Sequence, residues 1–222
     1  MNYYRKIIPI ILFSFISLTC FAETYNSAAA HTNAQLGMAY LNKGMYPASK
    51  HSLLLAIKED PQLASVWYCM AYYLEKTGHP TQAEKYYREA IKVKPHSGSA
   101  KNNYGTFLCR VGREKQGIKE LIAASKEHTY LNAASALENA GTCALMMHNK
   151  TLAMHYYHQA LANNPSMPFS ILSLARLNYQ MGNDAEAKRY YTYFEKLELT
   201  NKPTNVVKAY HDYVFGKKTV NG

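Results

Sequence analysis

The side chains best suited to chemistry are nine histidines and four cysteines, spread over 222 residues. Two histidines, His155 and His158, lie three residues apart, and His148 is nearby. Imidazoles bind zinc or copper, but metal sites normally recruit cysteines or carboxylates at tight spacing as well. A metal-binding accessory protein built on these histidines is the less favoured alternative, and we expect no metal and no cofactor.

The sequence also lacks the motifs that mark common enzyme classes. It contains no glycine-rich phosphate loop, no Gly-x-Ser-x-Gly turn for a nucleophile and no His-Glu-x-x-His zinc motif. We therefore expect no catalytic residues, no enzyme activity and no small-molecule substrate. Recognition of another macromolecule is the function that remains.

The first 22 residues are typical of an export signal. Arg5 and Lys6 precede an apolar run over residues 7–18, which is shorter than the roughly 20 apolar residues of a spanning helix. Cleavage after Ala22 would leave residues 23–29 as a flexible N-terminus. We expect an exported, periplasmic protein.

Two alternatives for this leader stay open. Cys20 could carry a lipid, as in bacterial lipoproteins, and would then anchor the chain at the inner face of the outer membrane. Ser17 and Thr19 match the usual lipid-attachment pattern poorly. The other alternative is an uncut N-terminal membrane anchor.

The chain is basic, with a formal net charge of +10, or about +8 without Arg5 and Lys6. Such a charge can indicate nucleic acid or an acidic partner. Export argues against nucleic acid, and the lysines and arginines are scattered along the sequence. We expect no nucleic acid, and a partner with acidic segments remains an alternative to a merely solvated basic surface.

The elements that must position any binding side chain follow a repeat of 34 residues, the separation of Pro61 and Pro95. This is the length of a tetratricopeptide repeat, in which a helix, a turn and a second helix together take up 34 residues. It predicts an all-α fold, a right-handed superhelix of five to six helix pairs. The five expected units cover residues 30–63, 64–97, 98–133, 134–167 and 168–201, followed by a capping helix at 202–215 and a flexible tail at 216–222.

Small residues explain how the two helices of a unit can approach. They stand eight places into the later units, as Ala71, Gly105, Gly141 and Ala175. Four glycines are expected to end first helices, namely Gly44, Gly78, Gly112 and Gly182. In the fourth unit Asn149 can take the left-handed conformation instead. Pro203 fits the first turn of the capping helix.

In a superhelix of such units the first helices line the concave side. Amides, tyrosines and charged groups at the inward places suit binding of an extended segment or a helix. Asn103 and Asn139, at equivalent places of neighbouring units, are the first candidates. The expected groove comprises Tyr68, Tyr72, Asn102, Asn103, Thr106, Arg110, Glu138, Asn139, Arg176 and Tyr179.

Cys109 and Cys143 lie at the twelfth and tenth places of neighbouring first helices. In an oxidising compartment they could form a disulfide that joins the third and fourth units. A loop of about 33 residues predicts roughly 3 to 4 kcal/mol of stabilisation. The alternative is two buried thiols that pack as small apolar groups.

Four segments go beyond generic repeat spacing and cover the mature chain. They are LGMAYLNKG at 36–44, KNNYGTFLCR at 101–110, ENAGTCAL at 138–145 and YYTYF at 190–194. With them the chain resembles the type IV pilus biogenesis and stability proteins. That resemblance implies an exported repeat scaffold, pilotin-like in some members, which helps the outer-membrane pilus secretin to localise, multimerise or stay stable. A generic exported scaffold for another envelope assembly is the alternative, and the poor lipid-attachment pattern at Cys20 is a departure from the lipoprotein members.

Overall fold

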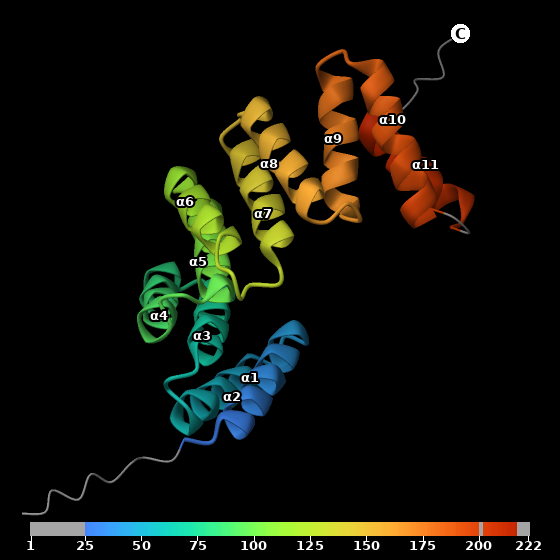
Figure 1. Ribbon diagram of the computed structural model, residues 1–222. Helices are drawn as coiled ribbons and strands as arrows, with labels where there is room; N and C mark the ends of the chain where they lie inside the picture. Colours follow the sequence, from blue (N-terminus) through green and yellow to red (C-terminus); the bar gives the residue numbers. More distant parts are fainter. Residues whose placement is uncertain (1–24, 200–201, 217–222) are drawn as a thin grey trace, which may run out of the picture.

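The structure is a computed structural model that describes residues 25–199 and 202–216, and within these residues every regular element is a helix (Figure 1). The all-α repeat fold predicted from the 34-residue spacing is therefore confirmed. The helices are α1 (Ser27–Asn42), α2 (Tyr46–Glu59), α3 (Ala64–Lys76), α4 (Pro80–Val93), α5 (Gly98–Arg110), α6 (Glu114–Ser125), α7 (Ala133–Met146), α8 (Lys150–Asn163), α9 (Pro168–Gln180), α10 (Asp184–Phe194), the π-helical turn η1 (Glu195–Leu199) and α11 (Thr204–Phe215).

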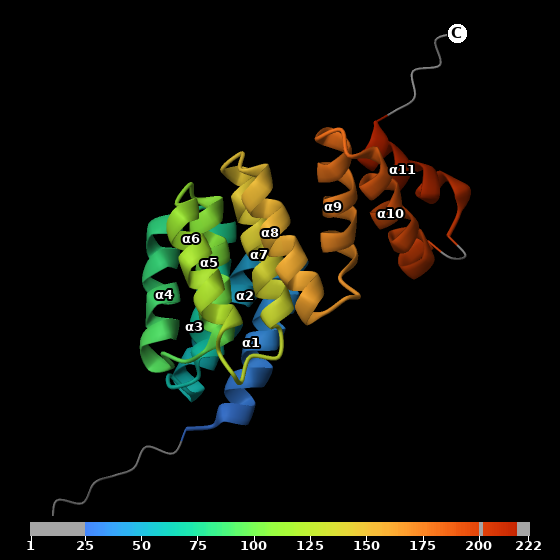
Figure 2. The same cartoon turned by 45° about the horizontal axis from the view of Figure 1, so that its top comes forward.

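Helices pair in chain order, α1 with α2 through α9 with α10, and the pairs stack into an arc. The first helices α1, α3, α5 and α7 contact one another in sequence and lie on the inner side of the arc (Figures 1 and 2). The second helices α4, α6 and α8 lie on the outer side. One continuous ribbon thus has two faces, each built from one class of helix.

Four of the five turns inside the pairs use glycine, as expected. Gly44, Gly78, Gly112 and Gly182 have φ between +71° and +81°, and each lies two residues after the end of a first helix. An L side chain is disfavoured in this region, and glycine is not.

The fourth turn corrects the prediction made for Asn149. His148 takes the left-handed conformation, with φ of +57°, whereas Asn149 has φ of −95°. The Asn149 side chain instead accepts a hydrogen bond from the Leu152 amide at 3.0 Å, and so caps α8. Asparagine is a favoured N-cap because it satisfies an amide that has no partner inside the helix.

The described N-terminal residues depart from the expected flexible segment at 23–29. Residues 27–29 form the first turn of α1, because the Asn26 side chain accepts a hydrogen bond from the Ala29 amide at 3.0 Å. The predicted signal peptide at 1–22 lies outside the described residues. Across 25–199 and 202–216, each helix is too short or too polar to cross a membrane.

The third pair shows how closely its helices approach. A Cβ atom added to Gly105 would lie 2.8 Å from the Gly117 carbonyl oxygen, and one added to Gly117 would lie 2.7 Å from the Gly105 carbonyl oxygen. The small residues Ala71, Gly141 and Ala175 are also buried. Large neighbours such as Tyr87 and Tyr157, both fully buried, fill the space beside them.

The last helix, α11, covers the end of the ribbon. Val214 is buried, and Phe215 packs edge-on against Tyr191 of α10 with ring centroids 5.2 Å apart. Pro203 lies just before the helix as its N-cap residue, and not in the first turn, because its ψ of 145° is extended. The helix expected at 202–215 thus runs from Thr204 to Phe215.

The contact between α5 and α6 yields a stability prediction. On helix propensity alone, Gly105→Ala should stabilise the protein by about 1 kcal/mol. We expect it to destabilise by about 1–3 kcal/mol instead, because the new methyl group meets a backbone oxygen that cannot rotate away. Urea denaturation followed by circular dichroism measures the change, and a gain in stability would contradict the close approach.

Candidate partner-binding groove

The predicted groove residues lie on four first helices. Tyr68 and Tyr72 are on α3, the group from Asn102 to Arg110 is on α5, Glu138 and Asn139 are on α7, and Arg176 and Tyr179 are on α9. Those on α3, α5 and α7 occupy helices that contact each other along the inner side of the arc. The structure therefore brings eight of the ten candidates onto neighbouring helices of one face.

The two tyrosines of α3 are half-buried. Burial raises the pKa of the Tyr68 phenol to about 12, and the nearby Cys69 and Tyr130 add to the shift. Lys76 lies with its ammonium nitrogen 5.3 Å from the centre of the Tyr72 ring, which is within cation–π range. Tyr72 thus has its ring edge and its hydroxyl available to a partner, while Lys76 already occupies part of one face of the ring.

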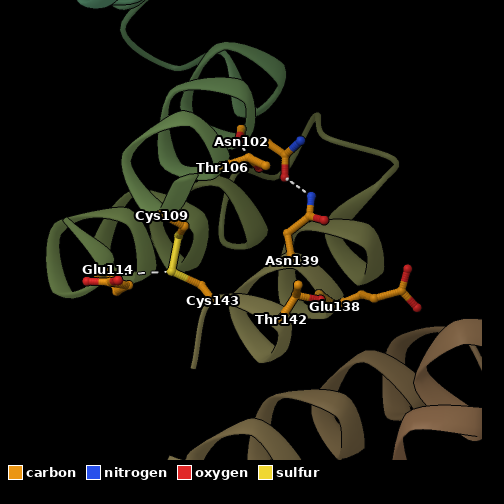
Figure 3. The surroundings of a disulfide bond; sticks show 8 residues. All are labelled: Asn102, Thr106, Cys109, Glu114, Glu138, Asn139, Thr142 and Cys143. Carbon is orange, nitrogen blue, oxygen red and sulfur yellow. Dashed lines mark hydrogen bonds between the residues drawn. A yellow bond between two sulfur atoms is a disulfide. The ribbon is translucent and has the colours of Figure 1, made fainter. Parts of the chain in front are cut away.

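The asparagines make contacts inside the protein. Asn139 Nδ2 donates to Asn102 Oδ1 at 2.9 Å and so joins α7 to α5, as Figure 3 shows. Asn103 Nδ2 donates to the Ser99 carbonyl at 2.8 Å, and Thr106 Oγ1 donates to the Asn102 carbonyl at 2.7 Å. Each amide retains unused hydrogen-bonding capacity, because an asparagine side chain has two N–H donors and an acceptor oxygen.

Charged groove residues also connect neighbouring units. Arg110 of α5 donates from Nε and Nη2 to the two oxygens of Glu75 on α3, at 2.5 and 2.8 Å. Glu138 of α7 accepts from the amide and the hydroxyl of Ser170 on α9, at 3.1 and 2.7 Å. A two-bond contact of this kind fixes the orientation of both partners. The polar lining therefore sets the position of one unit against the next.

Arg176 and Tyr179 differ from the other candidates because α11 packs beside them. The Arg176 guanidinium lies 4.2 Å from the centre of the Tyr213 ring, and Tyr179 packs edge-on against Phe215 at 5.2 Å. The structure therefore places these two side chains at the contact with the capping helix, apart from the eight residues on α3, α5 and α7.

The two cysteines predicted to pair are brought together. Cys109 of α5 and Cys143 of α7 form a disulfide with their Cα atoms 5.5 Å apart, and both residues are buried (Figure 3). The Cys143 sulfur also lies 3.5 Å from the Glu114 carbonyl oxygen at the start of α6. The bond therefore joins two inner helices, about one turn along α7 from Asn139 and two turns along α5 from Asn102.

Gly117 is a residue whose role the sequence reasoning missed. It occupies the twentieth place of its unit, where the second, fourth and fifth units have alanine. A Cβ atom there would collide with the Cys109 sulfur. The sequence did contain a signal for this role, because a glycine replaces alanine at this place and the paired first helix carries a cysteine.

A second missed feature is the loop after α6, which contains the two extra residues of the third unit. Tyr130 packs against the backbone of Gly98, so closely that a Cβ atom on Gly98 would overlap its ring. Lys101 and Glu127 form an ion pair, and His96 Nδ1 lies 3.5 Å from the Glu127 carboxylate. The extra length lets the loop fold back over the start of α5 at the edge of the inner face.

On the outer side, Glu84 joins the second and third units. It accepts hydrogen bonds from Arg88 at 2.7 Å, Arg113 at 2.8 Å and the Tyr104 hydroxyl at 2.9 Å. Burial by itself would raise the pKa of this carboxyl, but these donors outweigh it and lower the pKa to about 2. Glu84 is thus a charged contact whose contribution depends on pH.

The histidines considered for a metal site have other neighbours. His155 packs against the Tyr156 ring, and His158 Nδ1 lies 3.3 Å from the Tyr190 hydroxyl. Within residues 25–199 and 202–216, no three histidine, cysteine or acidic side chains come close enough to hold a metal ion.

Comparison with known proteins identifies the fold family. The tetratricopeptide-repeat family model matches residues 29–196. The chain belongs to the tetratricopeptide-repeat family. This assignment makes it a protein-interaction scaffold, with the inner face of its first helices as the candidate site.

Two relatives of similar sequence show which proteins with these repeats the chain resembles. The type IV pilus assembly protein PilF of Pseudomonas aeruginosa is 29% identical over 160 residues, which are 72% of this chain and 64% of PilF. An uncharacterized Haemophilus influenzae protein is 26% identical over 148 residues, 65% of this chain and 83% of that protein. The chain thus spans less than two thirds of the PilF length, and it is homologous to PilF.

Solved structures of pilus biogenesis proteins have the same fold as this chain. A structure of Pseudomonas aeruginosa PilF superposes with a TM-score of 0.69 at 26% identity, covering 85% of this chain and 87% of the chain in that structure. The crystal structure of PilW, a type IV pilus biogenesis factor, also gives a TM-score of 0.69, at 23% identity, covering 88% of this chain and 96% of the chain in that structure. PilW shows the shared fold. The resemblance to type IV pilus biogenesis repeat proteins predicted from the sequence is confirmed.

The disulfide makes a countable prediction. A chain beginning at Glu23, denatured without reductant, should show one reactive thiol, that of Cys69. In the native state this thiol should react slowly, because burial raises its pKa to about 12. Cys69→Ala is the control and should show none, whereas three thiols in the parent chain would rule out the bond. Reduction should lower stability by roughly 3–4 kcal/mol.

Glu84 makes a prediction about pH. Since its folded pKa of about 2 lies below the reference value of 4.5, its stabilising contribution is present above pH 4.5 and is lost as the pH falls toward 2. We expect the difference in unfolding free energy between the parent protein and Glu84→Gln to shrink over that range. Urea titrations at several pH values measure it, and a difference independent of pH would contradict the assignment.

Proposed function

We propose that this protein is an exported scaffold for type IV pilus biogenesis, which assists localisation, multimerisation or stability of the pilus secretin at the outer membrane. The observation that carries the proposal is the 29% identity to PilF over 160 residues. A fold of stacked repeats supports it, because an array of this kind offers one extended surface for a single partner.

The inner face of α3, α5 and α7 is the proposed site for that partner. Tyr68 and Tyr72 supply aromatic area, and Asn102, Asn103 and Asn139 supply amides, all half-buried. Their contacts within the protein hold them in place before a partner arrives, which lowers the entropic cost of binding. A peptide strand or helix laid across these three helices would meet two aromatic rings and then the amide pair.

Export is part of the proposal, with the periplasm as the working compartment. The Arg5–Lys6 start and apolar run of the leader support it, and so does the disulfide, because such bonds persist in oxidising compartments. Attachment to the inner face of the outer membrane through a lipid on Cys20 is the alternative to cleavage after Ala22, and mass measurement of the exported protein distinguishes the two.

Deletion of the gene tests the secretin part of the proposal. We expect cells without the protein to form fewer heat-resistant secretin multimers, measured by immunoblotting, and the intact gene to restore them. Unchanged multimers would refute a role in secretin assembly. Recovery of other envelope proteins, without secretin, in a pull-down would instead support a scaffold for a different envelope assembly.

Substitutions within the same experiment test the groove. Tyr72→Ala and Asn103→Ala should restore multimers less well than the intact gene, while helicity stays unchanged. Tyr46→Ala is the matched control, because Tyr46 is an exposed tyrosine, 48% accessible, on the second helix α2. Full restoration by Tyr72→Ala would exclude Tyr72 from the partner site, and equal loss in the control would indicate a general effect of removing tyrosine.

A further inference from the structure

The second helices carry a regular column of basic side chains. At the twenty-second place of the five units stand His51, Lys85, Lys119, His155 and Arg189, and all five are exposed. One residue of this type at the same place in every unit forms a row along the ribbon. The row lies on the helices that face away from the candidate groove.

The column belongs to a wider stripe. Places 18, 22, 25 and 29 of a unit follow helical spacing on one side of the second helix, although Lys126 is the residue just after α6 and Lys196 lies in η1 after α10. Over the five units these twenty places hold nine lysines or arginines, three histidines and no acidic residue. All are exposed except Ile122, which is half-buried. The chain has 15 acidic residues elsewhere, so their absence here gives this outer stripe a single sign of charge.

Much of this charge is not neutralised inside the protein. Among the described residues, Lys85, Lys119 and Lys126 have no ion-pair partner. Arg88, Lys92 and Arg189 pair with Glu84, Glu89 and Glu186 of their own helices, so these three charges are partly neutralised. The stripe therefore has charge available for an external anion.

Grooves with apolar residues in their lining lie between successive second helices, and so between the basic sides of these helices. Between α4 and α6 a groove of about 440 Å³ has Ile91 and Leu108 in its lining and Arg88 and Lys119 among its polar groups. Glu120 also lines it and moderates the positive charge.

The next interval, between α6 and α8, is similar. A groove of about 480 Å³ there is lined by Ile122, Leu137 and Tyr156, with Lys126 and His155 as its basic groups. The same combination of apolar floor and basic border thus recurs in successive units.

We infer that this outer stripe is a second binding surface, for an acidic polypeptide segment that contains apolar residues and runs along the ribbon. Its carboxylates would meet the lysines and arginines, and its apolar side chains would enter the grooves between second helices. A bilayer is a poorer fit, because its flat surface would touch the crests of the helices and leave the recessed apolar floors uncovered. The surface is separate from the inner groove and does not depend on the proposed secretin role.

The test measures binding of a fluorescent peptide with six Glu-Leu-Asp repeats by anisotropy. The stripe variant carries Lys85→Glu, Lys119→Glu and Lys126→Glu. The control variant carries Lys43→Glu, Lys94→Glu and Lys202→Glu, which are exposed, lack ion pairs among the described residues and lie outside the stripe. Both variants change the net charge equally, so any difference between them reports the position of the charges.

We expect the stripe variant to bind the peptide at least about tenfold more weakly, and the control to change by less than about threefold. A peptide of Glu-Ser-Asp repeats should bind more weakly than the Glu-Leu-Asp peptide, because it cannot fill the grooves. Tyr72→Ala should bind the acidic peptide as the parent protein does, which separates this surface from the inner groove. Circular dichroism checks helicity, and a Lys→Gln version of the stripe variant repeats the test without reversed charge.

Several results would overturn the inference. Equal weakening in stripe and control variants would mean that net charge alone attracts the peptide. No binding by the parent protein would exclude an acidic segment of this kind. Binding to vesicles of phosphatidylglycerol and phosphatidylethanolamine, lost in the stripe variant while the peptide fails to bind, would assign the surface to a membrane instead.

Discussion

The close approach of the two helices in each unit is the constraint on which the rest of the structure depends. In the third unit the backbones of Gly105 and Gly117 meet with no room for a side chain on either. In the fourth, Gly141 instead leaves room for the ring of Tyr157, whose nearest atom would lie 2.7 Å from an added Cβ atom. Small residues on the first helices thus make room for the second helices, and the neighbouring units cover what each pair leaves exposed, so that the stack forms one continuous core.

This stacking explains why the inner face is both a candidate site and a set of joints. Glu75 with Arg110, Asn102 with Asn139, and Glu138 with Ser170 each connect consecutive first helices. The disulfide adds a covalent joint between α5 and α7, the helices that the central pair also connects. A partner bound across several units would therefore meet side chains whose positions are already fixed, and the surface would lose little entropy on binding.

The two faces of the ribbon have different chemistry. The inner face combines aromatic rings, amides and internally paired charges, whereas the outer stripe has exposed basic groups of one sign. The proposed secretin role concerns the inner face, and the inferred acidic segment concerns the outer one. A scaffold with two such surfaces could hold two components of an envelope assembly at once, since neither surface covers the other.

The sequence by itself determined the repeat, the places of the close contacts, the left-handed glycines and the family, because these depend on residue type at a fixed period. It also brought Cys109 and Cys143 to adjacent helices, since neighbouring units share a register. Only the tertiary structure decided that Asn139 meets Asn102, that His148 rather than Asn149 turns left-handed, and that α11 packs beside Arg176 and Tyr179. These outcomes depend on side-chain distances of a few ångströms between units and on competition for the same polar partner, which a one-dimensional pattern does not contain.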